Sequence, residues 1–113
     1  MAQIPENIDN AVREYVSELS KEIPVHKAIL FGSYASGNYT KDSDVDLAIF
    51  SDYFEGTSRI DGIKFLLSRA RKYIQMDFQP IPFTYRDFIE RDGFAAEVLK
   101  EGVEILSMAT DQK

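Results

Sequence analysis

Two short apolar segments joined by a polar loop constrain the fold of this chain most strongly. Residues 28–31 and 45–50 have the length and apolar content of buried strands, and the intervening residues 32–43 are rich in Gly, Ser, Asn and Thr. In the second segment Val45, Leu47 and Ile49 share one face, while Asp44, Asp46 and Ala48 share the other. We therefore expect a sheet strand that buries one face and presents two carboxylates on the opposite face.

Amphipathic segments surround these strands. The spacing of apolar residues predicts a helix over residues 5–23 and a second helix with its core stripe at Ile60, Ile63, Leu66, Leu67, Ala70, Tyr73 and Ile74. Thr84 and Asp87 resemble a capping box for a helix from about Tyr85, and a further helix is expected over residues 94–101. Strands are expected over residues 76–81 and 103–106, and fraying is expected from Ala109. We expect one α+β domain over residues 1–113, with helices packed on a small sheet.

Composition excludes several classes of function. The 113 residues contain 13 Lys and Arg against 19 Asp and Glu, which gives a net charge of −6 and argues against a stand-alone nucleic-acid binder. There is no Cys, which excludes disulfides, a thiol nucleophile and a Cys-based zinc site. The sequence has no apolar stretch near the ~20 residues that span a bilayer and no signal-peptide pattern, so no membrane contact and a cytoplasmic location are expected.

Gly32 and Ser33 stand where the first apolar segment ends. A strand that runs into Gly-Ser and then a helical turn leaves backbone N–H groups unpaired, and these donors with the Ser33 hydroxyl form a natural phosphate cradle. Gly32 has no Cβ, so the backbone there can approach a phosphate closely. The alternative is an ordinary turn with no ligand.

Three aspartates complete the candidate site. Asp44 and Asp46 are two residues apart on a strand, so their carboxylates project from one face about 6.6 Å apart at the backbone. Paired carboxylates can share Mg²⁺, which completes its shell with substrate phosphates. Asp77 lies between Met76 and Phe78 in the next predicted strand and is the candidate third carboxylate. The alternatives are a solvated loop edge for the first pair and a strand-end residue or salt bridge for Asp77.

The Gly32-Ser33 pair, followed after ten residues by Asp44-Val45-Asp46, resembles the signature of the DNA polymerase beta-like nucleotidyltransferase superfamily. The spacing, the trailing Leu47 and the small size are most similar to its minimal nucleotidyltransferase branch, over a motif core of residues 25–106. The resemblance implies a small mixed β-sheet flanked by helices. It also implies that Gly32 and Ser33, with Ser43, hold a nucleoside triphosphate. Asp44, Asp46 and Asp77 would be the catalytic residues and the ligands of two Mg²⁺ ions.

The same resemblance implies an activity and a partner. Family members transfer a nucleoside monophosphate, such as AMP from ATP or the equivalent part of another nucleotide, to a hydroxyl group. Minimal members are often encoded beside HEPN-domain toxins as toxin–antitoxin pairs, so a tyrosine of a nearby HEPN protein is the expected acceptor, in a homo- or hetero-oligomer. Ser36 stands where many minimal members have Arg, so one cation expected near the phosphates is missing. The alternatives are a non-catalytic antitoxin that binds its partner stoichiometrically and a transferase for a small molecule or tRNA.

One charged segment remains outside this assignment. Arg59, Lys64, Arg69, Arg71 and Lys72 oppose only Asp61, so residues 59–72 are cationic in an acidic chain. This pattern is typical of a solvated helix face whose long side chains cover apolar surface. The second interpretation is contact with an acidic partner or with nucleotide phosphates.

Overall fold

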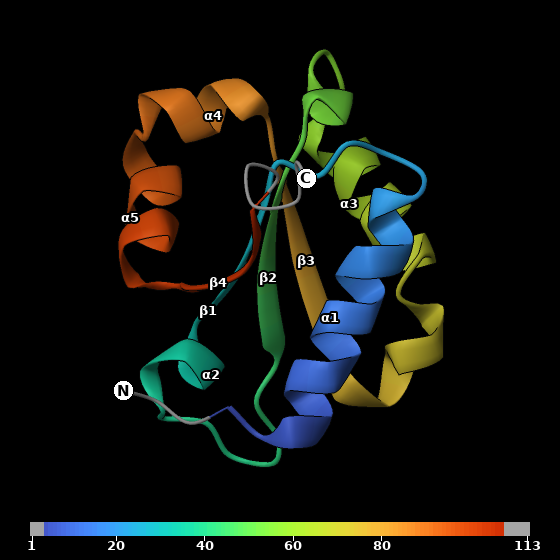
Figure 1. Ribbon diagram of the computed structural model, residues 1–113, viewed down its shortest axis with the longest axis vertical. Helices are drawn as coiled ribbons and strands as arrows, with labels where there is room; N and C mark the ends of the chain where they lie inside the picture. Colours follow the sequence, from blue (N-terminus) through green and yellow to red (C-terminus); the bar gives the residue numbers. More distant parts are fainter. Residues whose placement is uncertain (1–3, 108–113) are drawn as a thin grey trace.

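Helices and strands are interspersed along residues 4–107, the part of the chain that the computed structural model describes. Figure 1 shows a sheet near the centre with helices on both sides. The elements are α1 (Glu6–Ser20), β1 (Lys27–Phe31), α2 (Ser33–Ser36), β2 (Val45–Phe50), η1 (Asp52–Phe54), α3 (Arg59–Ser68), η2 (Arg71–Met76), β3 (Phe78–Phe83), α4 (Tyr85–Glu90), α5 (Gly93–Glu101) and β4 (Val103–Ser107), where η denotes a 3₁₀-helix.

The four strands of this region form one mixed sheet in the order β3-β2-β1-β4. β1 is antiparallel to β2 and β4, whereas β2 and β3 are parallel and start in register at Val45 and Phe78. The parallel pair needs a long crossover connection, which η1, α3 and η2 provide. The fold is therefore the α+β arrangement of a small mixed sheet flanked by helices that the sequence predicts.

Two apolar clusters lie on opposite faces of the sheet. The larger one joins α1 to Leu30, Val45, Leu47 and Ile49, and it includes Leu66 of α3. The smaller one joins α5 to the other sheet face, with members Ile29, Ala48, Phe50, Phe83, Ala95 and Val98. The predicted alternation along β2 is confirmed, because Val45, Leu47 and Ile49 face the α1 side. The side chain of Asp46 therefore belongs to the α5 side of the sheet.

The single helix expected up to Ile74 is wrong, because the chain forms α3 and η2 with a break at Ala70. The buried hydroxyl of Tyr15 donates a hydrogen bond to the Leu66 carbonyl at 2.8 Å. In a regular helix that carbonyl would accept from Ala70 N–H, which instead bonds to the Leu67 carbonyl at 3.0 Å. Part of the expected core stripe is also wrong, since Ile60, Leu67 and Ile74 are exposed.

The third strand begins two residues later than expected, at Phe78 rather than Met76. Asp77 has φ +52° and ends η2, so it turns the chain into β3 instead of lying within the strand. β3 is an edge strand, as its prolines indicate. The Asp77 carbonyl accepts from Val45 N–H of β2, and the Phe83 carbonyl accepts from Ser51 N–H just after β2. By alternation, Pro80 and Pro82 therefore turn their missing N–H positions to the open edge.

The remaining predictions differ from the structure by only a few residues. α1 ends at Ser20 rather than residue 23, because Lys21 and Glu22 already bond three residues back, to Glu18 and Leu19. The capping box is confirmed, with Thr84 and Asp87 bonded reciprocally at 2.9 and 3.1 Å. Within residues 4–107, no helix is long and apolar enough to cross a membrane. The expected fraying from Ala109 lies outside the described residues.

Candidate active site

Gly32 connects β1 to the one-turn helix α2. It has φ +78° and ψ −150°, a backbone conformation that residues other than glycine rarely adopt. The N–H groups of Ala35 and Ser36 both bond to the Gly32 carbonyl at 3.1 Å. The N–H groups of Ser33 and Tyr34 precede these bonds and have no acceptor within the helix. The turn thus offers the backbone donors that a phosphate cradle needs.

Asp46 lies against this turn. Phe31 and Asp46 are opposite each other in the β1–β2 pair, which brings the Asp46 side chain over Gly32. A Cβ added to Gly32 would lie 3.1 Å from Cγ and 3.3 Å from Cβ of Asp46 and would collide with Oδ2. Close approach is therefore possible only because residue 32 is glycine. The carboxylate and the cradle form one continuous surface.

Asp44 and Asp46 influence each other electrostatically. Burial raises the pKa of Asp46 above its ordinary value, and the negative charge of Asp44 raises it further. Asp46 is partly buried, whereas Asp44 is exposed at the last position before β2. Both carboxylates therefore act on the same small region, and a positive charge placed there would be favoured by both.

The backbone of Asp77 is bonded next to Asp44 and Asp46, but the Asp77 side chain does not gather with theirs. The N–H of Val45 donates to the Asp77 carbonyl at 3.0 Å, so Asp44 and Asp77 each directly precede paired strands. Asp77 is exposed, so the argument that a buried charge there needs a partner is wrong. Within residues 4–107, no three His, Cys, Asp or Glu side chains gather closely enough to hold a metal ion.

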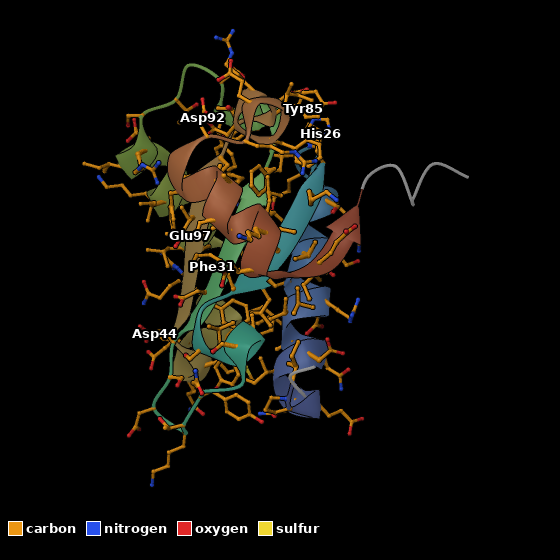
Figure 2. The ribbon with its side chains drawn as sticks, turned by 90° about the vertical axis from the view of Figure 1, so that its left-hand side faces the viewer. His26, Phe31, Asp44, Tyr85, Asp92 and Glu97 are labelled. Atoms are coloured by element: carbon orange, nitrogen blue, oxygen red, sulfur yellow. The ribbon has the colours of Figure 1, made fainter. Side chains whose placement is uncertain are left out.

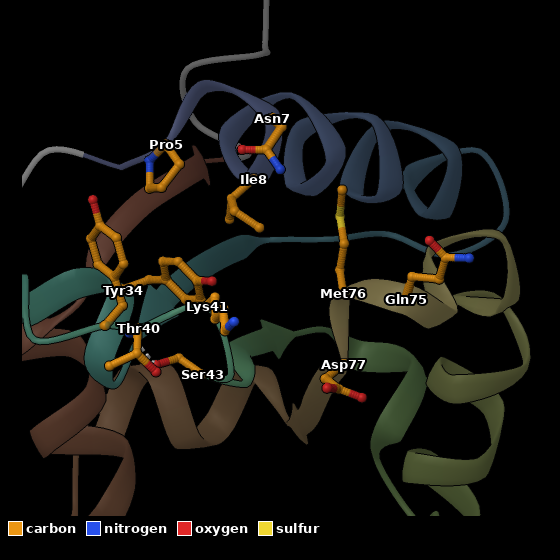
Figure 3. A pocket seen from close by; sticks show the side chains of 11 residues that line it. Pro5, Asn7, Ile8, Tyr34, Thr40, Lys41, Ser43, Gln75, Met76 and Asp77 are labelled. Atoms are coloured by element: carbon orange, nitrogen blue, oxygen red, sulfur yellow. Dashed lines mark hydrogen bonds between the residues drawn. The ribbon is translucent and has the colours of Figure 1, made fainter.

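Ser43 and Asp77 line a cavity of about 420 Å³ behind the loop that precedes β2. Figure 3 shows Tyr34, Thr40 and Ser43 on one side of this cavity and Asp77 on the other. Tyr34 stacks on Tyr39, with ring centroids 4.8 Å apart. The Ser43 oxygen accepts a hydrogen bond from Thr40 N–H at 2.8 Å, so Ser43 shapes the turn that leads to Asp44.

Comparison with known proteins identifies the family. The family model described as a nucleotidyltransferase domain matches residues 10–105. The chain belongs to the nucleotidyltransferase family. One relative, a protein of Methanocaldococcus jannaschii provisionally named a protein adenylyltransferase, is 32% identical over 98 residues, which are 81% of this chain and 96% of that protein. A second protein of that organism with the same provisional name is 44% identical over 48 residues, 41% of this chain and 48% of the relative. The chain therefore spans about half the length of this second relative.

Two solved structures share the fold of this nucleotidyltransferase. One is a provisionally named nucleotidyltransferase from Sulfolobus solfataricus, with a TM-score of 0.65 and 21% identity over 87% of this chain and 78% of that one. The other is a toxin–antitoxin complex with AMP-PNP, with a TM-score of 0.59 and 18% identity over 91% of this chain and 76% of that one. At these identities the likeness establishes a common architecture.

The carboxylate pair of this nucleotidyltransferase fits a magnesium site in part. Mg²⁺ prefers oxygen ligands, commonly one or two carboxylates together with substrate phosphates. Asp44 and Asp46 supply two carboxylates, and the pKa of Asp46 is raised by burial and, secondly, by the negative charge of Asp44, which a cation would offset. The cradle at Gly32 places phosphate-binding groups beside them. These residues suit a metal that arrives with a nucleotide better than a metal held by protein groups alone.

Sequence reasoning missed a second wall of this site. Gly32 also lines a cavity of about 320 Å³ with Phe31 and with Phe94, Glu97 and Glu101 of α5. Figure 2 shows Asp44, Phe31 and Glu97 on the side of the molecule that carries α5. Phe31 and Phe94 are in edge contact, with centroids 5.6 Å apart. The four-residue spacing of Glu97 and Glu101 is visible in the sequence, but the position of α5 beside Gly32 is not.

Proposed function

We propose that this chain is a magnesium-dependent nucleotidyltransferase that transfers AMP from ATP to a hydroxyl group of a partner protein, a HEPN-domain toxin. The observation that carries the proposal is the contact between the Asp46 carboxylate and the Gly32 turn, with Asp44 beside it. A phosphate cradle and a carboxylate pair on one surface suit phosphoryl transfer. The names of the Methanocaldococcus relatives support the reaction, and the toxin–antitoxin neighbour with its ATP analogue supports the nucleotide and the partner.

The cradle and the aspartates have separate roles in this reaction. The Ser33 and Tyr34 N–H groups and the Ser33 hydroxyl bind the triphosphate oxygens. Asp44 and Asp46 would hold Mg²⁺ together with the triphosphate oxygens, and the metal would neutralise phosphate charge and lower the pKa of the attacking hydroxyl. The acceptor oxygen forms a bond to the α-phosphorus while the bond to the bridging oxygen breaks, so pyrophosphate leaves. The Asp77 carboxylate accepts the hydroxyl proton.

The test uses ATP labelled at the α-phosphate, Mg²⁺ and the purified protein encoded by the neighbouring gene. We expect label on that protein with the wild-type chain, and none with Asp44→Asn, with Asp46→Asn or after chelation of the metal. Asp42→Asn is the matched control, because Asp42 is an exposed carboxylate of the same loop. Equal labelling by the wild type and the Asp44 and Asp46 variants would refute the enzymatic proposal.

The second candidate function is neutralisation of the partner by stoichiometric contact. It is favoured by the absence of a three-carboxylate cluster within residues 4–107 and by Ser36 in place of a cation beside the cradle. In this case the Asp44→Asn/Asp46→Asn double variant still protects cells from the toxin. Loss of protection while the double variant still binds the toxin would exclude this second function.

A further inference from the structure

The outer surface of α3 and η2 carries an exposed apolar line. Ile60, Leu67 and Ile74 follow one another at seven-residue intervals and are 66%, 44% and 76% exposed. The inward face of the same segment is already filled by Leu66 and Tyr73, which are buried. Single exposed apolar residues are common, but Leu67 of α3 and Ile74 of η2 line one cavity across the break at Ala70, which indicates a contact surface.

A cavity of about 270 Å³ opens at one end of this line. Leu67 and Ile74 form its apolar walls, Phe78 contributes buried surface, and Arg71 and Asp77 also line it. The cavity has room for one apolar side chain of a second molecule. Its walls combine apolar surface with one exposed cation, Arg71, and one exposed carboxylate, Asp77, which suits a mixed protein surface.

The charge around the line is positive, although the whole chain has a net charge of −6. Two of the five cations of this segment are used internally, because Arg69 pairs with Glu22 at 2.7 Å and Lys72 with Glu14 at 3.4 Å. Lys64 and Arg71 form no ion pair within residues 4–107.

Arg59 likewise lies 5.9 Å from the ring centroid of Phe83 and pairs with no acid of the described region. Arg59, Lys64 and Arg71 are therefore available to carboxylates of another molecule, and they outnumber the two exposed acids of the same segment and cavity, Asp61 and Asp77.

We propose that this surface, formed by Ile60, Leu67, Ile74, Arg59, Lys64 and Arg71, docks an acidic partner protein that inserts an apolar side chain into the cavity. Opposite charges would orient the partner, and the buried apolar anchor would hold it. Three cations on an acidic chain are few for a nucleic acid, which needs many phosphate contacts. The ten-residue α3, packed on the sheet through Leu66, is poorly placed to enter a membrane.

The position of Asp77 connects this surface to the active site. Asp77 lines the docking cavity, and its carbonyl bonds to Val45, the residue after Asp44. A protein seated in the cavity therefore contacts Asp77, the proposed acceptor of the hydroxyl proton. This last step rests on the proposed nucleotidyl transfer, and it identifies the docked protein as the acceptor.

The test measures binding of the purified protein encoded by the neighbouring gene to variants of the full chain. Ile74→Ser and Arg71→Glu change exposed side chains, so both variants should fold. We expect each to weaken binding about tenfold or more. The matched controls are Ile89→Ser, at a 58% exposed apolar residue of α4, and Arg86→Glu, at an exposed cation of α4. Both controls should bind like the wild type.

Every other outcome overturns the proposal. These outcomes are no binding of that protein, equal binding by all variants, self-association of this chain through the same residues, or preferential binding to anionic vesicles or single-stranded RNA. Asp44→Asn separates this proposal from the proposed function, because it should bind the partner normally without transferring label. If the docking pattern is found but the wild type transfers no AMP, the docking surface stands and the transferase proposal fails.

Discussion

The carboxylate of Asp46 occupies the space that a Cβ on residue 32 would fill. The pairing of Phe31 with Asp46 across β1 and β2 sets this contact, and a Cβ on residue 32 would collide with Oδ2 of Asp46. The backbone of Gly32 is also at φ +78°, where side chains cause strain. Two independent constraints thus require glycine at the point where the phosphate cradle meets the carboxylate pair.

Gly32→Ala should therefore cost both stability and nucleotide binding. Strain at positive φ and the collision with Asp46 should lower the free energy of unfolding by about 2–4 kcal/mol, measured by urea denaturation. Gly56→Ala is the control, because Gly56 has φ +76° but no atom within 4 Å of the added Cβ. It should lose only the strain component, about 1 kcal/mol. Equal losses for the two variants would show that the contact with Asp46 does not constrain residue 32.

Neutralising Asp46 should stabilise the protein at neutral pH. Burial and the charge of Asp44 raise its pKa above 3.8, so the folded protein binds a proton more readily than the unfolded chain. Stability of the wild type therefore falls as pH rises from 3.8 through the raised pKa. Asp46→Asn should have a higher free energy of unfolding than wild type at neutral pH, and this difference should shrink as pH falls from the raised pKa to 3.8.

The cause of this shift can be separated by NMR titration of the Asp46 carboxyl carbon. Removing the charge in Asp44→Asn should lower the pKa of Asp46 while leaving it above its ordinary value, because burial is the larger cause. Asp42→Asn, at an exposed residue of the same loop, should leave the titration of Asp46 unchanged. A pKa of Asp46 that is identical in wild type and Asp44→Asn would contradict the proposed interaction of the pair.

Local patterns in the sequence predicted the parts of the fold that local physics determines. The alternation of Val45, Leu47 and Ile49 placed Asp46 on the correct face of β2, and Thr84 with Asp87 marked the start of α4. The break between α3 and η2 was missed, because it depends on a hydrogen bond from Tyr15, 51 positions away in the chain. The sequence pattern wrongly places Ile60, Leu67 and Ile74 in the core, because apolar residues lie on more than one face of this segment and only the packing shows that Leu66, Ala70 and Tyr73 are the buried ones.

The residues of the site also fall into two groups, those that local sequence patterns predict and those that only tertiary packing brings to the site. Gly32 and Asp46 come together because β1 and β2 are neighbouring strands joined by a short connection, which the sequence pattern indicates. Asp77 directly precedes β3, a strand reached by a long crossover, so its left-handed backbone and its exposure could not be derived from neighbouring residues. Glu97 reaches the site through the packing of α5 on the sheet, which is tertiary information.

Tyr15→Phe should destabilise the protein and affect the end of α3. The Tyr15 hydroxyl is buried, and its loss leaves the Leu66 carbonyl with only the Arg69 N–H as donor, at 3.2 Å. We expect a loss of about 1–2 kcal/mol in the free energy of unfolding. Tyr73→Phe is the matched control, because its hydroxyl bonds at 2.9 Å to the exposed Glu14, where water can replace it. A larger loss for Tyr73→Phe would contradict this assignment.

Ser36→Arg should strengthen nucleotide binding. Ser36 ends α2, is exposed, and lines the same cavity as Gly32, so an Arg side chain there can reach a phosphate in the cradle. Charge-assisted hydrogen bonds are stronger than neutral ones, and we expect about tenfold tighter binding of ATP with Mg²⁺ by calorimetry at low salt. The gain should shrink at high salt, because the site is open to solvent.

Ser36→Gln is the matched control for this prediction, since it adds length and hydrogen-bonding capacity without charge. It should bind ATP like the wild type. Glu97 and Glu101 oppose the gain by attracting the new guanidinium away from the phosphate, so adding Glu97→Gln to Ser36→Arg should increase the affinity further. An unchanged affinity in Ser36→Arg and in this double variant would place the triphosphate away from α2, and the role of Gly32 and Ser33 as its cradle would then be wrong.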